Sequence, residues 1–164
     1  MKLSVLHKLK NKLTIIFLIV SLIANIFFIC FYILNFKNLK TNQFEKALAV
    51  EVIDGDTIIL EDGRHIRYLG IDTPELNDYL GIEATNRNKE LVEGKIVELQ
   101  KEDREIDEYG RYLRYVYVDG IFVNAELITE GFAESFIFDP NDRYSQVLVQ
   151  LEQYAKLKKA GIWK

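Results

Sequence analysis

The chain has 164 residues, of which 25 are acidic and 21 basic, with two histidines and one cysteine. All acidic residues lie beyond residue 44 and six basic ones precede it, so residues 45–164 carry 15 basic against 25 acidic side chains, a formal charge of −10. This charge argues against a domain that binds nucleic acid through a generally basic surface. Because Cys30 is the only cysteine, the acidic part has neither an intrachain disulfide nor a cysteine-based zinc site.

The N-terminal part is dominated by residues 13–34, an apolar run without a charged side chain. As a helix this run would reach about 33 Å, enough to cross a hydrocarbon core of about 30 Å. Four lysines lie within residues 1–12, so the positive-inside rule places this basic stub in the cytoplasm and the C-terminal part outside. We therefore predict a single-pass anchor in the lipid bilayer at the cell membrane, followed by a polar tether over residues 35–46.

A cleaved signal peptide is the alternative, and it would give a secreted protein. Ala47-Leu48-Ala49 resembles a cleavage site of small residues. However, the apolar run exceeds the roughly 7–15 residues of a signal peptide core. The site also lies well beyond the run and overlaps a predicted strand, so the retained anchor is favoured.

The remaining chain, residues 47–164, has the length of one domain. Runs rich in β-branched residues predict five strands, and Asp-Gly pairs at Asp54-Gly55 and Asp62-Gly63 predict turns between the first three. The five strands are Ala47–Ile53, Thr57–Leu60, His65–Leu69, Lys95–Gln100 and Leu113–Val118.

Three helices are expected between and after these strands. The first covers Glu83–Val92 with Gly94 just past its end, and the second is short, capped by Asn124 and ended by Gly131. The third begins near Asp142 and ends at Gly161. Its core-facing stripe follows helical spacing and consists of Tyr144, Val147, Leu148, Leu151, Tyr154 and Ala155. The order of elements is compatible with an α+β fold built on a five-stranded Greek-key barrel of the OB type, although periodicity alone does not select it over other α+β folds.

Charged residues gather around the second and third strands. A hairpin at Asp62-Gly63 would bring Asp56 and Asp72 to one end of a small sheet, with Arg67 beside them. Converging carboxylates suit a hard cation such as Ca²⁺, and a guanidinium suits a phosphate. Either aspartate alone could instead be an ordinary turn residue, and Arg67 could point to solvent.

Five further candidates lie outside this hairpin. Glu75, directed by Pro74, could act on a water molecule, and Arg111 could place a second guanidinium on a phosphate. Tyr109 could contact a terminal phosphate. Phe136 and Phe138 could stack on the bases of a single strand, although core packing is the alternative. The two histidines, His7 and His65, lack metal-ligand spacing and are interpreted as structural or exposed.

Three segments together resemble the staphylococcal nuclease (thermonuclease) family. They are Val-Ile-Asp-Gly-Asp-Thr at 52–57, Arg-x-x-Gly-Ile-Asp-Thr-Pro-Glu at 67–75 and Asp-x-Tyr-Gly-Arg at 107–111. The resemblance implies an OB-type barrel and Ca²⁺-dependent hydrolysis of single-stranded or unpaired DNA and RNA that leaves 3′-phosphate ends.

The same resemblance assigns a role to each matching residue. Asp56 and Asp72 would bind Ca²⁺ through their carboxylates and Thr73 through its backbone carbonyl. Asp54 would lie next to these ligands without binding the metal ion itself. Glu75 would act on the attacking water. Arg67 and Arg111 would hold the phosphate, with Tyr109 on its 3′ side. A monomer is expected.

The chain departs from the family pattern in its polar contacts. The loop from Glu75 to Gly81 is short and lacks lysine, Glu108 replaces a lysine, and Phe136 and Phe138 replace tyrosines. With the acidic charge, these departures predict weaker substrate binding. Two alternatives to an active nuclease are a non-catalytic nuclease-like module that binds nucleic acid or protein, and an unrelated membrane-tethered interaction domain.

Overall fold

The computed structural model describes residues 21–22, 25–26, 44–137 and 143–164. The chain divides into two units, Met1–Asn42 and Gln43–Lys164, which are described separately. In the first unit, Ser21, Leu22, Asn25 and Ile26 are helical, and Asn25 donates a hydrogen bond to the Ser21 carbonyl at 2.9 Å. Most of the predicted span over residues 13–34 lies outside the described residues. Within the described ones, no helix is both long and apolar enough to cross a bilayer.

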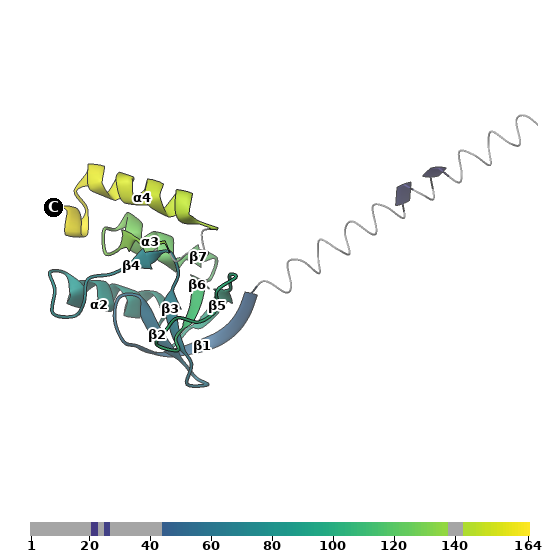
Figure 1. Cartoon of the computed structure of the whole chain (residues 1–164), viewed down its shortest axis with the longest axis horizontal. Helices are drawn as coiled ribbons and strands as arrows, with labels where there is room; N and C mark the ends of the chain where they lie inside the picture. The colour runs from purple at the N-terminus through teal and green to yellow at the C-terminus, as the bar shows by residue number, and fades with distance from the viewer. Residues whose placement is uncertain (1–20, 23–24, 27–43, 138–142) are drawn as a thin grey trace, which may run out of the picture. The chain divides into compact units, whose positions relative to one another are not determined.

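The second unit is built on a closed five-stranded barrel, as the sequence predicted. Its strands are β1 (Phe44–Val52), β2 (Thr57–Leu60), β3 (His65–Tyr68), β5 (Ile96–Gln100) and β6 (Tyr112–Val118). They run in the order β3-β2-β1-β5-β6, and β3 also pairs with β6, which closes the sheet on itself (Figure 1). The β3–β6 pairing is parallel, whereas the other four are antiparallel. Closure leaves few exposed strand edges.

Three helices and several short elements surround the barrel (Figure 1). The helices are α2 (Gly81–Val92), α3 (Val123–Thr129) and α4 (Ser145–Lys158). The short elements are β4 (Ile71–Asp72), β7 (Ile121–Phe122), β8 (Glu134–Ser135) and the 3₁₀ helix η1 (Gly161–Trp163). Helix α2 packs against β1 and α3, and α3 packs against β6 and α4. β4 and β8 form a separate two-stranded sheet.

A large hydrophobic core fills the barrel and the space beneath the helices, and a smaller cluster of Leu69, Leu113 and Tyr115 lies apart from it. Alternation along the strands directs Ile58 and Leu60 of β2 and Ile66 and Tyr68 of β3 inward, each at most 1% exposed. The helices add Leu127, Ile128 and Leu148 to the same cluster. Among the described residues, every core residue belongs to Gln43–Lys164, so this unit has a core of its own, as an independently folding domain does.

Several predicted boundaries were wrong for reasons that lie in the tertiary pairing. β1 begins at Phe44 rather than Ala47, because residues 44–46 pair with β5, so the predicted tether overlaps the strand. Asn124 does not cap α3, which begins at Val123. Its side chain is instead fully buried, accepting a hydrogen bond from the Val116 amide at 2.9 Å and donating one to the Leu69 carbonyl at 2.7 Å.

The predicted stripe on the last helix was only partly correct. α4 begins at Ser145 and ends in a left-handed Lys159, before Gly161. Val147 and Tyr154 are about half exposed, at 49% and 50%, whereas Glu152 is buried. Glu152 accepts a hydrogen bond from the Ser135 hydroxyl at 3.2 Å, so its burial is compensated by polar contacts that no helical periodicity could reveal.

Candidate active site

The first part of the site forms where β2 begins and β3 ends. Antiparallel pairing sets Thr57 opposite Arg67, so Asp56, which precedes β2, lies beside the end of β3. The Tyr68 amide donates to the Asp56 carbonyl at 2.9 Å, fixing this juxtaposition through the backbone. The Arg67 Nε lies 3.0 Å from the Asp56 Oδ1, and both side chains are only 6% exposed.

Arg67 also reaches Asp72, the second residue of β4. Its Nη2 donates to the Asp72 Oδ1, and its Nη1 donates to the carbonyls of Tyr68 and Ile71, each at 2.8 Å. The guanidinium therefore bridges two carboxylates and has a fixed orientation. The sequence placed Asp56, Arg67 and Asp72 together, and the structure brings them together.

Thr73 completes the cluster from the other side of Asp56. Its amide and its hydroxyl donate to the Asp56 Oδ2 at 2.9 and 3.0 Å. Gly55 is needed for this approach, since a Cβ there would lie 2.6 Å from the Thr73 Oγ1. The Asp54 Oδ1 accepts a hydrogen bond from the Asp56 amide at 3.0 Å, so Asp54 lies directly behind Asp56, as expected.

The electrostatics of the cluster leave excess negative charge. Burial raises the pKa of Asp56 from 3.8 to about 6, and the nearby Asp54 carboxylate adds to the rise, whereas Arg67 and hydrogen bonds from Thr73 oppose it. The group contains three carboxylates, those of Asp54, Asp56 and Asp72, and one guanidinium, that of Arg67, which pairs with Asp56 and Asp72. A divalent cation would offset the remaining charge, and oxygen donors are the ligands that Ca²⁺ prefers. The donor chemistry of Asp56, Asp72 and Thr73 therefore fits Ca²⁺, although no group of three or more His, Cys, Asp or Glu side chains within the described ranges has metal-site geometry.

Glu75 lies in a strongly acidic pocket that adjoins this cluster and shares Asp72 and Thr73 with it. The pocket has a volume of about 340 Å³, and its lining includes the carboxylates of Asp72, Glu75, Asp78 and Glu134. The turn after Glu75 is tightly closed, because the Asp78 amide donates to the Glu75 carbonyl at 2.8 Å. A Cβ at Gly81 would lie 1.8 Å from that carbonyl oxygen, so the backbone at Glu75 is held in place by the start of α2.

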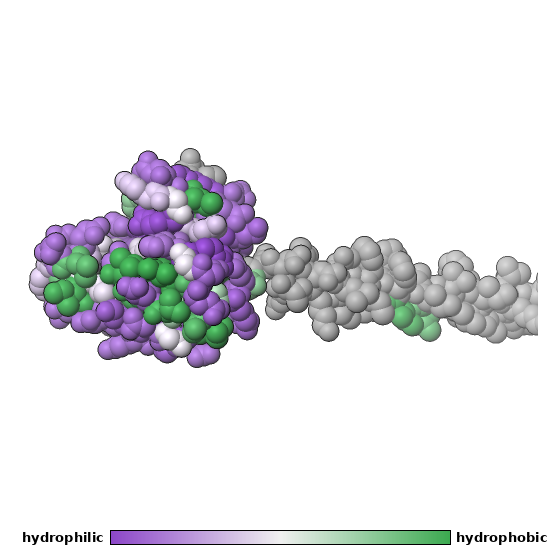
Figure 2. Space-filling view, turned by 90° about the horizontal axis from the view of Figure 1, so that it is seen from below, coloured by the Kyte–Doolittle hydropathy of each residue, from purple (hydrophilic) through white to green (hydrophobic). Residues whose placement is uncertain are grey.

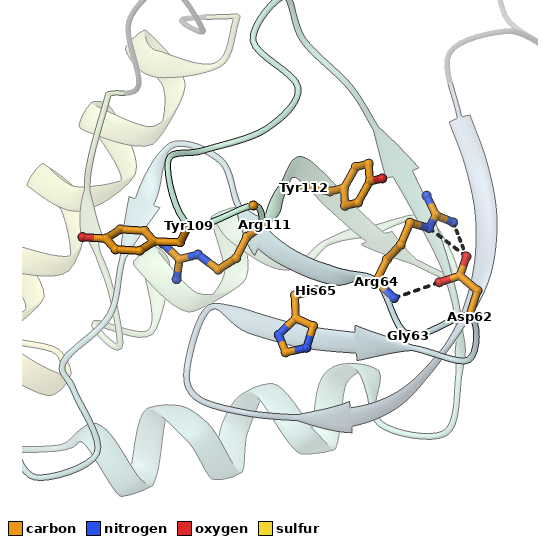
Figure 3. Close-up of a pocket in the computed structure, with 8 residues that line it drawn as sticks. Asp62, Gly63, Arg64, His65, Tyr109, Arg111 and Tyr112 are labelled. Carbon is orange, nitrogen blue, oxygen red and sulfur yellow. Dashed lines mark hydrogen bonds and ion pairs between the residues drawn. The ribbon is translucent and has the colours of Figure 1, made fainter.

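Arg111 and Tyr109 lie in a different pocket, which Figure 3 shows. The Arg111 Nε contacts the Asp107 Oδ2 at 2.7 Å, and its guanidinium lies 5.4 Å from the centre of the Tyr109 ring. Although burial opposes the effect, the hydrogen bonds and charge of Arg111 lower the pKa of Asp107. The structure thus does not bring Arg111 into the lining of the acidic pocket that holds Glu75.

Of the predicted aromatic pair, Phe136 lies among the described residues. Phe136 is 46% exposed, and its amide donates to the Gly70 carbonyl at 2.9 Å, which attaches this segment to the turn after β3. Phe138 lies outside the described residues. The partial exposure of Phe136 is compatible with stacking, which stays a prediction.

The sequence missed two supporting groups. Asn88 on α2 is fully buried, donates to the Asp54 carbonyl at 3.0 Å and accepts from the Tyr68 hydroxyl at 2.9 Å. Glu134 pairs with Asp72 across β4 and β8. Asn88 could have been noticed in the sequence, because it is an asparagine at a core-facing position of an amphipathic helix. No sequence signal identifies Glu134, because a strand of two residues is too short to show a pattern.

Comparison with known proteins agrees with this architecture. The family described as "Staphylococcal nuclease homologue" matches residues 65–164. "Endonuclease YncB" of Bacillus subtilis (strain 168) is 44% identical over 141 residues, covering 79% of this chain and 64% of that protein. "SPbeta prophage-derived endonuclease YokF" of the same organism is 44% identical over 123 residues, covering 68% of this chain and 41% of that protein.

A third relative is matched over most of its own length. "Thermonuclease" of Staphylococcus intermedius is 35% identical over 139 residues, covering 78% of this chain and 82% of that protein. The chain spans less than two thirds of the two Bacillus proteins but most of the staphylococcal one. The match over the barrel and helices, together with the Asp56–Arg67–Asp72 cluster, leads to one conclusion: the chain belongs to the staphylococcal nuclease family.

Proposed function

We propose that the chain is a Ca²⁺-dependent nuclease that hydrolyses phosphodiester bonds in DNA and RNA and leaves 3′-phosphate ends. One observation carries the proposal: Arg67 is held rigidly between the carboxylates of Asp56 and Asp72 at one end of the barrel. This arrangement offers a phosphate-binding cation beside oxygen ligands for a metal ion. The names of the relatives, an endonuclease and a thermonuclease, support the nuclease part of the proposal.

In this proposal each residue has a defined task in catalysis. Asp56, Asp72 and the Thr73 carbonyl would hold Ca²⁺, which supplies Lewis acidity and orients the phosphate. Glu75 takes a proton from the attacking water or positions that water. Arg67 donates to phosphate oxygens and offsets the charge that grows on them in the transition state, and Arg111 assists from the neighbouring pocket. Two carbonyls hold Arg67 in place, so little reorganisation is needed during the reaction.

The proposed substrate is single-stranded or unpaired nucleic acid bound by a monomer. Tyr109, which is 77% exposed, contacts a phosphate, and Phe136 and Phe138 stack on bases. Because the domain carries a formal charge of −10, long-range attraction of a polyanion is weak and binding depends on these local contacts. We expect a raised KM compared with a basic nuclease.

The proposed location is the outer face of the cell membrane, with residues 13–34 as the anchor. The length of the apolar run and the lysines before it support this location. Secretion after cleavage is the alternative. Protease treatment of intact cells, followed by detection of both ends of the chain, tests the orientation. Release of the acidic domain into the medium without protease would instead favour secretion.

A non-catalytic binding module is the second candidate function. One observation favours it: both arginines are already paired with carboxylates, Arg67 with Asp56 and Asp72, and Arg111 with Asp107. A phosphate must compete with these carboxylates, which weakens its binding. In the first candidate, Asp56 and Asp72 would also hold Ca²⁺, whose positive charge would offset their attraction for Arg67.

Cleavage of single-stranded DNA by residues 43–164 decides between the two. The reaction is run in Ca²⁺ and in chelator, with Glu75→Gln as the test variant and Glu93→Gln, an exposed glutamate at the end of α2, as the matched control. Cleavage that needs Ca²⁺, falls by orders of magnitude in Glu75→Gln and persists in Glu93→Gln supports the nuclease. Nucleic-acid binding without any cleavage by the folded domain supports the module.

A further inference from the structure

Residues 153–164 form a basic segment in an otherwise acidic domain. They include four lysines and no aspartate or glutamate, whereas the domain as a whole carries a formal charge of −10. All four lysines are exposed, at the end of α4 and on either side of η1. We call them the C-terminal lysine surface, which consists of Lys156, Lys158, Lys159 and Lys164. Positive charge gathered in this way attracts a polyanion locally, even on a protein of negative net charge.

Most of this positive charge is not neutralised by neighbouring carboxylates. Lys156 lies 3.4 Å from the Glu152 carboxylate. Within the described part of the chain, Lys158, Lys159 and Lys164 form no ion pair. The arginines of the domain differ in this respect, because six of the seven pair with a carboxylate. The three unpaired lysines can therefore bind an anion without first giving up a carboxylate.

Stabilisation of α4 explains only part of this lysine cluster. Cations in the last turn of a helix interact favourably with its macrodipole, and Lys156 and Lys158 occupy that turn. Lys159 closes the helix through its backbone, because its amide donates to the Lys156 carbonyl at 3.1 Å. Lys164 lies beyond η1, outside the helix. The side chains of Lys159 and Lys164 are therefore available to a ligand.

Two aromatic rings are interleaved with the lysines. The Lys156 Nζ lies 4.2 Å from the centre of the Trp163 ring, and the Lys158 Nζ lies 5.6 Å from the centre of the Tyr154 ring. Tyr154 is half exposed. Proteins that bind single-stranded nucleic acid combine basic side chains, which contact the backbone, with aromatic rings, which stack on bases. The surface thus has both kinds of group that such a strand requires.

η1 connects the C-terminal lysine surface to the acidic pocket that holds Glu75. Ile162, the middle residue of η1, lines that pocket, and Lys164 follows it by two residues. The Ile162 amide donates to the Gly131 carbonyl at 2.9 Å, and a Cβ at Gly161 would lie 2.0 Å from the same carbonyl oxygen, so η1 is held firmly. Figure 1 shows η1 beside the end of α4. A nucleic-acid strand that leaves the pocket past Ile162 meets the lysines next.

We propose that the C-terminal lysine surface binds the phosphate backbone of single-stranded nucleic acid outside the active-site pocket. Lys159 and Lys164 contact phosphates, and Tyr154 stacks on a base. The proposal rests on the proposed nuclease function and extends it, because it identifies where an acidic domain holds a polyanion that its pocket carboxylates repel. An anionic lipid surface is the other partner that exposed lysines suit, but the position of Ile162 in the pocket favours nucleic acid.

Binding of single-stranded DNA tests the proposal. Residues 43–164 are used, because they contain every core residue within the described ranges. The anisotropy of a fluorescein-labelled oligothymidylate reports affinity over a series of salt concentrations, in Ca²⁺ and in a Glu75→Gln background so that cleavage does not interfere. The test variant is Lys159→Gln/Lys164→Gln. The matched control is Lys46→Gln/Lys89→Gln, which removes two exposed lysines elsewhere and gives the same net charge.

The expected result is a loss of affinity and of salt dependence in the test variant alone. Its binding at low salt should be about fivefold weaker than that of the parent, the loss of two exposed ionic contacts. The slope of log affinity against log salt should fall by about 1.4, since each lost phosphate contact on a single strand removes about 0.7. Tyr154→Leu should weaken binding without changing the slope, because stacking releases no counterions.

Unchanged DNA binding in the test variant would overturn the proposal. Equal weakening in the test and control variants would also overturn it, because only net charge would then matter. Sedimentation with vesicles of phosphatidylglycerol and phosphatidylcholine identifies a lipid partner: vesicle binding that needs Lys159 and Lys164, together with unchanged DNA binding, would assign the surface to lipid instead. Because anisotropy needs no cleavage, failure of this surface and failure of the proposed nuclease activity are separate results.

Discussion

The raised pKa of Asp56 predicts that this residue destabilises the Ca²⁺-free domain above neutral pH. An aspartate with a pKa of 3.8 when unfolded and about 6 when folded binds protons more tightly in the folded state. Its contribution to stability is therefore fully present below about pH 4 and is lost as the pH rises through about 6. The full change amounts to about 3 kcal/mol, since each tenfold change in proton affinity corresponds to about 1.4 kcal/mol.

Asp56→Asn removes this dependence because asparagine does not titrate. Its four donors, from Arg67, Thr57 and Thr73, cannot all be accepted by one amide oxygen, so the absolute stability of the variant also includes lost hydrogen bonds. The difference in unfolding free energy between variant and wild type avoids this complication. It should shift by about 3 kcal/mol in favour of Asn as the pH rises across the window.

Urea unfolding of residues 43–164 measures this difference in chelator between pH 4 and pH 8. Trp163, the only tryptophan, provides the fluorescence signal. Asp103→Asn, at an exposed position, is the matched control and should follow the wild type at every pH. A constant difference between Asp56→Asn and wild type across this range would refute the reasoning, because it would mean that burial does not perturb the Asp56 carboxylate.

Three further predictions concern packing and substrate binding. Asn124→Ala leaves two buried backbone groups without partners and should lower the unfolding free energy by about 2–4 kcal/mol in urea titrations, whereas a loss below 1 kcal/mol would show that water replaces the side chain. Gly81→Ala forces a Cβ against the Glu75 carbonyl, so kcat should fall together with stability, and an unchanged kcat would argue that the position of Glu75 is not set by this contact. Arg111→Gln removes one phosphate contact and should reduce the slope of log affinity for single-stranded DNA against log salt by about 0.7. An unchanged slope would exclude Arg111 from phosphate binding, and a steep wild-type slope would contradict the weak overall attraction proposed for this acidic domain.

The two pockets differ in the charge of the side chains that line them. Carboxylates dominate the pocket around Glu75, whereas arginine and histidine side chains dominate the pocket around Arg111. A polyanion is repelled by the first unless cations are bound there, whereas in the second its phosphates can contact Arg111, although Asp107 already pairs with this arginine. This division explains why we expect substrate binding and cleavage to respond differently to removal of Ca²⁺: cleavage is lost, whereas part of the binding persists.

A surface apart from the two pockets is also notable for its apolar character. Figure 2 shows hydrophobic residues gathered on the face of the domain seen from below. Exposed apolar side chains of the domain include Leu76, Tyr79 and Ile82 around the start of α2, and Val50 and Ile96 on β1 and β5. Leu76 and Tyr79 belong to the short loop after Glu75, where the family pattern has lysines.

Local sequence patterns were sufficient for the strands and for the central cluster. Asp-Gly turns and β-branched runs determine the β2–β3 hairpin, and the hairpin in turn fixes the distance between Asp56, Arg67 and Asp72. These residues are close in the chain, and their contacts depend on short-range geometry. For the same reason, the helix over residues 83–92 was predicted to within two residues of its observed start at Gly81.

Only the tertiary structure decided the features that depend on distant segments. Parallel pairing of β3 with β6 closes the barrel and brings His65 beside Arg111, and the buried Asn124 joins β6 to the end of β3. The buried Glu152 and the early start of β1 likewise depend on partners far along the chain. The sequence by itself was enough to predict which residues would carry the chemistry, because turns and alternation are local. It could not determine how they divide between two pockets, because a side chain such as Arg111 takes its direction from whichever charged and aromatic groups the closed barrel places around it.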